Sequence, residues 1–116
     1  MTTILYGISN CDTVKKAKKW LEQQHIDYQF HDFRKDGIST DWVKATEQQV
    51  GIEVLLNKRG TTFRQLDEHT KQNLDTARAL ELMAEHPTLI KRPVLYHNDN
   101  VMVGFKADSY AKVFNQ

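Results

Sequence analysis

The sequence predicts one α/β domain in which a small mixed sheet carries an inserted block of helices. Three observations lead to this fold class. A β-α-β pattern opens the chain, residues 39–87 show helical periodicity, and two short apolar runs separated by a turn precede a last amphipathic segment. A chain of 116 residues is long enough to bury a hydrophobic core without disulfide or metal staples.

The opening β-α-β unit is read from three segments. Residues 3–6 form an apolar run that ends at a glycine, which predicts a short buried strand. Residues 12–24 carry apolar side chains at three-to-four spacing, which predicts a helix with Asn10 or Asp12 as its cap. Aromatic residues alternate with polar ones over 28–32, so a second strand is expected, parallel to the first through a right-handed crossover.

The inserted block contains several helices with recognisable boundaries. Ser39 or Thr40 can cap a helix that reaches residue 50, and a glycine follows it. Thr62 and Gln65 have the spacing of a capping box, which predicts a short helix around 63–68. Apolar spacing over 74–84 predicts another helix, and a proline follows it.

Beta character returns near the end of the chain. Residues 94–96 and 101–103 are apolar runs around a polar turn at 97–100, which predicts an antiparallel hairpin, and 110–114 give a closing helix its apolar face. The order β-α-β, insertion, β-β-α corresponds to a thioredoxin-like four-stranded mixed sheet. We expect a single domain over 1–116, with its core at about 1–38 and 88–116 and the helical insertion at about 39–87.

Composition narrows the function classes. The 16 Lys and Arg residues nearly balance 15 Asp and Glu, which argues against a general nucleic-acid binder. The single cysteine excludes an internal disulfide and suits a reducing compartment. Neither a signal-peptide pattern nor an apolar run long enough to cross a membrane is present, so we expect a cytoplasmic protein without a membrane partner. The five histidines lack metal-ligand spacing, and no metal site is expected.

The main functional candidate is Cys11, which lies between the first strand and the first helix. The first N–H groups of a helix lack intrahelical partners, and the helix dipole places partial positive charge there. Both effects favour a thiolate, as does the cluster Lys15, Lys16, Lys18 and Lys19. The ordinary alternative is a small buried side chain, because free cysteine is often buried. The polar loop and the basic neighbours favour a reactive thiol instead.

Motifs along the whole chain resemble one known family. The start reads Y-G-I-x-N-C-D-T-V-K-K-A, followed by R-P-V-L late in the chain and by V-G-F near its end. These motifs in this order resemble the ArsC/Spx family, and within it the YffB-type proteins. The resemblance implies a thioredoxin-like fold with an inserted helical subdomain, and a cysteine that performs thiol or oxyanion chemistry.

The resemblance also implies roles for individual residues. Cys11 matches the family's nucleophile, and Arg92 matches an arginine that in arsenate reductases contacts the oxyanion or glutathione. Pro93 corresponds to the proline that is cis in thioredoxin-like proteins. A second family arginine lies in the insertion. Asn57 holds its position in the arsenate reductase pattern, whereas Arg59 fits the Spx and YffB pattern.

Two departures from the family pattern bear on activity. The third arginine of arsenate reductases is absent, and Phe105 or Lys106 occupies its place. The Spx branch carries Cys-x-x-Cys, whereas this chain has Val14 at the second position. Any mixed disulfide must therefore be resolved by an external thiol, for which glutathione is the obvious candidate.

Three further residues near the thiol are candidates for ligand contact. Asn10 and Thr13 flank Cys11 and can either hydrogen-bond the sulfur or cap the helix. Lys15 lies close enough to the first helical turn to contact an anion, although lysines on a helix are commonly solvated.

The resemblance implies a glutathione-dependent reductase that acts through Cys11 on a disulfide or on an arsenate-type oxyanion. Glutathione is then a co-substrate, no cofactor is tightly bound, and glutaredoxin is a potential partner. The alternative is an Spx-like regulatory protein that binds RNA polymerase without turnover. The sequence leaves open which electrophile is physiological and what the oligomeric state is.

Overall fold

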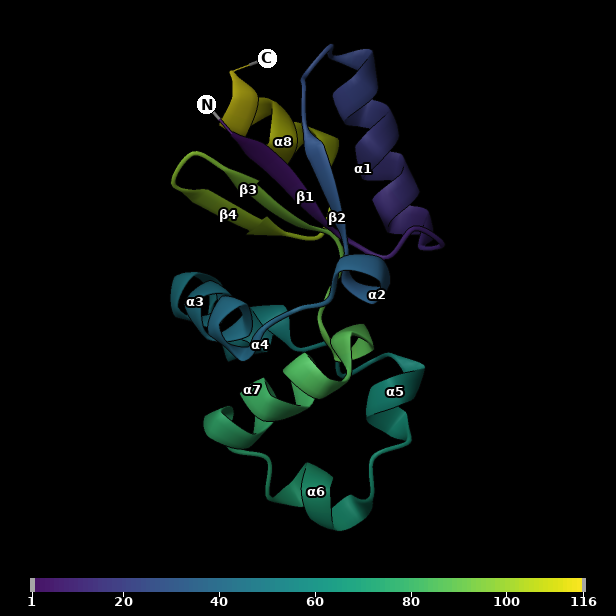
Figure 1. Cartoon of the computed structure of the whole chain (residues 1–116), viewed down its shortest axis with the longest axis vertical. Coiled ribbons are helices and arrows are strands. Elements are labelled where there is room, and N and C mark those ends of the chain that lie inside the picture. The colour runs from purple at the N-terminus through teal and green to yellow at the C-terminus, as the bar shows by residue number, and fades with distance from the viewer. Residues whose placement is uncertain (1, 116) are drawn as a thin grey trace. The chain divides into compact units, whose positions relative to one another are not determined.

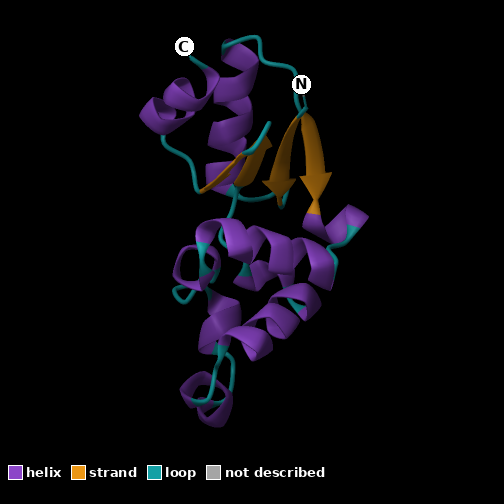
Figure 2. Cartoon of the chain, turned by 90° about the vertical axis from the view of Figure 1, so that its left-hand side faces the viewer, coloured by secondary structure: helices purple, strands orange, loops and turns teal. Residues whose placement is uncertain are grey.

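A computed structural model describes residues 2–115, which fold into two compact units. The first unit runs to Gly37 and resumes at Arg92, and the second unit is Ile38–Lys91. All strands of the described sheet belong to the first unit, and the second is built of helices, as Figure 1 and Figure 2 show. Among the described residues, no helix is long and apolar enough to cross a membrane.

The sheet of the first unit has the predicted thioredoxin-like topology. Its strand order is β2-β1-β3-β4. Strand β1 pairs in parallel with β2 and antiparallel with β3, and β3 pairs antiparallel with β4. The strands are β1 (Thr3–Gly7), β2 (Gln29–Asp32), β3 (Val94–His97) and β4 (Asn100–Val103). The predicted parallel crossover and the predicted hairpin are therefore both confirmed.

Two helices pack on one face of this sheet. Leu5 and Leu95 are paired across β1 and β3 and are fully buried. Against them lie the apolar faces of α1 (Asp12–Gln23) and α8 (Ala107–Phe114), where Tyr110 of α8 is also fully buried. This packing attaches α1 to the central strand β1, so the start of α1 is held near the end of that strand.

The second unit contains the helices predicted to reach residue 50 and to cover 74–84, and a shorter helix near the one predicted around 63–68. It also contains short helices at 52–55 and 68–72 that were not predicted. Ser39 caps the first helix of this unit, because its hydroxyl oxygen accepts a hydrogen bond from the N–H of Trp42 at 3.0 Å. The residue after that helix is Gly51, whose φ of 88° suits glycine. The elements are α3 (Thr40–Val50), α4 (Ile52–Leu55), α5 (Thr61–Arg64), α6 (Glu68–Gln72), α7 (Thr76–Glu85) and the 3-10 turn η1 (Pro87–Leu89).

The predicted capping box at Thr62 and Gln65 is wrong. Helix α5 begins two residues earlier than predicted, Gly60 occupies the N-cap position, and no side chain caps the helix. The hydroxyl of Thr62 instead hydrogen-bonds that of Thr88 at 2.6 Å. A long-range partner thus replaced the local bond, which the spacing of residues in sequence could not reveal.

A short helix, which the sequence analysis did not predict, follows β2 directly. Residues 33–36 form this helix, α2 (Phe33–Asp36). The carboxylate of Asp32 caps this helix by accepting hydrogen bonds from the N–H groups of Arg34 and Lys35, at 2.8 and 3.4 Å. Asp32 is consequently buried at the end of β2, although it is charged.

Candidate active site

Cys11 is held at the N-terminus of α1 by a tight turn after β1. Its backbone N–H donates to the carbonyl of Ile8 at 3.2 Å, and its own carbonyl accepts from the N–H of Lys15 at 3.0 Å. Cys11 itself is the N-cap residue, so the predicted caps Asn10 and Asp12 are wrong. Cys11 is partly buried and packs against the hydrophobic core between α1 and the sheet.

The close approach of α1 to β1 depends on Gly7. A Cβ atom added at Gly7 would lie 2.7 Å from Cγ2 of Val14, nearer than real Cβ contacts allow. Val14 is fully buried in the first turn of the helix, so it has little room to move. Gly7 therefore allows the first turn of α1, and the thiol with it, to lie directly against the end of the strand.

The surroundings of Cys11 favour its thiolate. Burial by itself opposes ionisation of the sulfur. The N–H of Val14, the guanidinium of Arg92 and the N–H of Thr13 outweigh this penalty, and together they lower the pKa of Cys11 below its ordinary value. The thiolate is the form that the helix N-terminus stabilises.

Arg92 reaches the thiol from the start of β3. The Arg92–Pro93 peptide bond is cis, as the resemblance implied. The carbonyl of Pro93 accepts a hydrogen bond from the N–H of Gly104 at 2.8 Å, which attaches this segment to the residue after β4. The guanidinium hydrogen-bonds the sulfur and also lowers the thiol pKa by its charge. The structure thus brings together Cys11, Thr13, Arg92 and Pro93 from two segments distant in sequence.

A contact between Ser9 and Asp32 was not anticipated from the sequence. The Ser9 hydroxyl hydrogen-bonds the carboxylate of Asp32, and this bond, with the N–H groups of Arg34 and Lys35, outweighs burial and lowers the pKa of Asp32. Asp32 is the partner of Gly7 in the parallel pair, so its carboxylate lies beside the loop that carries the thiol. The only sequence signal was an acidic residue at the end of a strand predicted to pair with β1.

The other predicted site residues of the first unit, Asn10 and Lys15, are exposed to solvent. Asn10 is exposed in the turn before the helix. Lys15 is exposed on α1, where it lines a shallow depression with Lys18, Lys19, Glu22 and Gln23. The amino group of Lys18 lies 3.6 Å from the centre of the Phe30 ring, so it is engaged in a cation–π contact.

Arg59 belongs to the second unit, in the loop between α4 and α5. Its backbone N–H donates to Oδ1 of Asn57 at 3.1 Å, and the N–H of Asn57 donates to the carbonyl of Leu89 at 2.7 Å. Asn57 and Arg59, the two candidates for the second arginine position, therefore lie in the same turn. The backbone hydrogen bonds of this turn are made to residues of the helical unit. Contact between Arg59 and the thiol stays a prediction.

Phe105 and Lys106 are the two residues expected where arsenate reductases have a third arginine, and the ring of Phe105 packs against the core of the first unit. It lies edge-on to the ring of Tyr110, with centroids 4.8 Å apart. An aromatic ring in this position offers an anion no hydrogen bond. Among residues 2–115, no group of three or more His, Cys, Asp or Glu side chains is arranged to hold a metal ion.

Comparison with known proteins identifies related chains over nearly the full length. The sequence model described as ArsC family matches residues 6–113. An uncharacterized protein of Haemophilus influenzae is 47% identical over 110 residues, covering 95% of this chain and 96% of that protein. Global transcriptional regulator Spx 2 of Bacillus anthracis is 27% identical, covering 94% of this chain and 84% of the regulator.

Two solved structures show the same fold at high identity. A YFFB protein superposes with a TM-score of 0.92 at 47% identity, covering 96% of this chain and 97% of the other. An arsenate reductase (ArsC) related protein from Brucella melitensis gives a TM-score of 0.79 at 46% identity, covering 100% of this chain and 97% of the other. This chain therefore shares its fold with both structures along nearly its full length.

Proposed function

The chain belongs to the ArsC family, and from that premise we propose that it is a glutathione-dependent thiol reductase with Cys11 as its nucleophile. The observation that carries this proposal is the environment of the sulfur. The start of α1 and the guanidinium of Arg92 lower the pKa of Cys11, which raises the fraction of nucleophilic thiolate at neutral pH. A cysteine kept only for packing would have no need of this arrangement.

The proposed reaction has two thiol–disulfide exchanges. The Cys11 thiolate attacks the glutathione sulfur of a mixed disulfide, a bond forms between these two sulfurs, and the substrate leaves as a thiolate that takes up a proton. A free glutathione, as its thiolate, then attacks the glutathione sulfur bound to Cys11. This step breaks the bond to Cys11, regenerates the Cys11 thiolate and releases glutathione disulfide. The net reaction converts the mixed disulfide and one glutathione into the substrate thiol and glutathione disulfide.

An external thiol is required because the chain has one cysteine. The position occupied by the second cysteine of a Cys-x-x-Cys motif holds Val14, which is fully buried below Gly7. Glutathione fits the site's chemistry, since Arg92 can pair with one of its carboxylates. Glutaredoxin is a further potential reductant of the Cys11–glutathione disulfide, and both reactions suit a reducing, cytoplasmic compartment.

A disulfide is a better proposed substrate than arsenate. An arsenic adduct carries two or three negative charges and is held best by three guanidiniums, whereas the third arginine is missing here. Of the two residues expected at its place, Phe105 packs on Tyr110 and Lys106 is a lysine, which lacks the bidentate guanidinium. The thioredoxin-like unit contributes Arg92 next to the sulfur. A single guanidinium suffices to favour the thiolate and to bind one carboxylate.

The second candidate function is regulatory. Several relatives are named global transcriptional regulator Spx, at 26–28% identity over most of this chain. An Spx-like protein that binds RNA polymerase would need a binding surface on this fold but would not need to catalyse a reaction. The absence of a second cysteine from the sequence argues against a disulfide switch and leaves binding itself open.

A coupled assay tests the enzymatic proposal. Oxidation of NADPH is followed with glutathione, glutathione reductase and either a glutathione mixed disulfide or arsenate, with and without glutaredoxin, for wild type and Cys11→Ser. We expect turnover of the mixed disulfide that depends on Cys11. Turnover of arsenate alone would replace the proposed substrate class. Rates equal to the blanks with both substrates would refute the proposal, and capture of RNA polymerase by Cys11→Ala would then support the regulatory alternative.

A further inference from the structure

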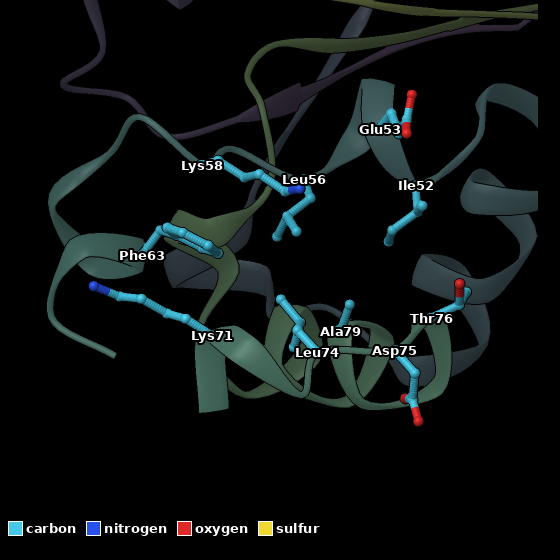
Figure 3. A pocket seen from close by; sticks show the side chains of 10 residues that line it. All are labelled: Ile52, Glu53, Leu56, Lys58, Phe63, Lys71, Leu74, Asp75, Thr76 and Ala79. Atoms are coloured by element: carbon cyan, nitrogen blue, oxygen red, sulfur yellow. The ribbon is translucent and has the colours of Figure 1, made fainter. Parts of the chain in front are cut away.

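The helical unit contains a pocket that is separate from the residues around the thiol. It offers about 160 Å³ of free space, and all of its lining residues lie within Ile38–Lys91. Figure 3 shows apolar side chains from α4, α5, α7 and the segments between them turned toward its centre. These apolar residues are Ile52, Leu56, Phe63, Leu74 and Ala79.

The walls of this pocket are fixed by backbone hydrogen bonds. The N–H of Asn57 donates to the carbonyl of Leu89 at 2.7 Å, and the N–H of Lys91 donates to the carbonyl of Leu55 at 2.8 Å. Leu56 forms an isolated bridge with Ile90 and is buried, as is Ala79 on the opposite wall. A ligand would therefore meet a preformed surface that has both apolar and polar parts, and ordering that surface would cost little free energy.

The charged groups around the pocket are not equivalent. The carboxylate of Asp75 caps α7 by accepting from the N–H of Arg78 at 2.8 Å, and the side chains of Asp75 and Glu53 point away from the pocket in Figure 3. The amino group of Lys71 donates to the carbonyl of Arg64 at 2.9 Å and is 3.5 Å from the carboxylate of Glu68. These charges are therefore engaged elsewhere or directed outward.

Lys58 is the charged group that remains for a ligand. Its side chain runs across the rim of the pocket in Figure 3, and among residues 2–115 its amino group has no hydrogen-bond or ion-pair partner. The turn that carries Lys58 is closed by the bond from Arg59 N–H to Asn57 Oδ1. A Cβ added at Gly60 in the same turn would come within 2.9 Å of the Asn57 side chain, so the turn is also tightly packed.

We propose that this pocket binds a small carboxylic acid with one ring or a branched chain of similar size, its apolar part on Leu56, Leu74 and Ala79 and its carboxylate at Lys58. The volume supports this size, because an apolar cavity of about 150 Å³ in another protein accommodates benzene. The charge at the rim selects an anion over a cation of the same shape. This ligand site is independent of the reaction at Cys11.

Phenylacetate is a suitable probe, with acetate and phenylacetamide as matched ligands that lack the ring or the charge. Binding to the full chain is followed by changes in amide NMR signals during titration. We expect phenylacetate to bind with a Kd of roughly 1 mM, as ligands of about ten heavy atoms commonly do. The shifted signals should belong to α4, α7 and the turn at Lys58. Acetate should bind at least tenfold more weakly, since it lacks the ring.

The variant Lys58→Gln tests the role of the charge, with Lys44→Gln on α3 as the control, because Lys44 is exposed and does not line the pocket. We expect Lys58→Gln to weaken phenylacetate about threefold to fivefold, the range of an exposed ion pair, and to leave phenylacetamide unchanged. Lys44→Gln should change neither. The proposal is overturned if phenylacetate causes no shift up to 20-fold above the expected Kd, roughly 20 mM, if both lysine variants weaken it equally, or if its shifts map to Cys11 and Arg92.

Discussion

The variant Gly7→Ala tests how the thiol loop is held against the sheet. Gly7 lies in β1 and does not have a positive φ, so alanine is acceptable to the backbone and the cost is purely steric. The new methyl group would lie 2.7 Å from Cγ2 of the buried Val14. Overpacking of this kind costs about 1–3 kcal/mol, which corresponds to a decrease in Tm of roughly 3–12 °C in a domain of this size.

A double-mutant cycle separates this clash from other effects. Val14→Ala alone should cost about 2 kcal/mol through lost burial and a cavity. In that background the two valine methyl groups that the added methyl would meet are gone, so Gly7→Ala should then cost less than about 0.5 kcal/mol. Urea unfolding of the wild type, both single variants and the double variant measures the coupling free energy.

The same change should also affect the thiol. The N–H of Val14 is one of the groups that lower the pKa of Cys11, and displacement of the first turn of α1 would weaken this interaction. We expect Gly7→Ala to raise the thiol pKa, measured by thiolate absorbance against pH. The reasoning is refuted if Gly7→Ala is as stable as wild type, or if its cost is the same in the wild-type and the Val14→Ala backgrounds.

Three further predictions follow from the described contacts. Arg92→Gln should raise the pKa of Cys11 and slow its alkylation by iodoacetamide at pH 7, because the guanidinium bond and charge that favour the thiolate are lost; an unchanged rate would contradict the assigned contact. The pKa of Asp32 is lower in the folded protein than in the unfolded chain, so its stabilisation is present above about pH 4 and is lost as the pH falls through the folded-state value. Urea midpoints from pH 7 to pH 2 should therefore fall less for Asp32→Asn than for wild type, and equal slopes would contradict this. Ser39→Ala should cost about 1 kcal/mol by removing the cap of α3, whereas the neighbouring Thr40→Ala should cost clearly less; equal losses in urea unfolding would show that the Ser39 hydroxyl is not the cap.

The sequence alone determined the order of elements and the place of the nucleophile. Strand and helix periods are local properties, so β1, α1, β2 and the closing hairpin could be located from residues a few positions apart. The same locality placed Cys11 at the start of a helix, where an unpaired N–H group and the helix dipole act over one turn. The same locality restricted the cap of α3 to Ser39 or Thr40, and the structure shows that it is Ser39, whose acceptor oxygen lies three residues before its donor.

Only the tertiary structure decided which distant groups meet these local features. The pairing of β1 with β3 and the packing of α1 on Leu5 bring Arg92 to the sulfur, and the parallel pairing of β1 with β2 brings Asp32 to Ser9. The Thr62 hydroxyl forms its hydrogen bond with Thr88, which is distant in sequence, and not with the predicted local partner. A side-chain hydrogen bond gains about the same free energy from either partner, so residue spacing alone cannot choose between them. The choice is made by the burial of the core, which sets the positions of the strands and helices.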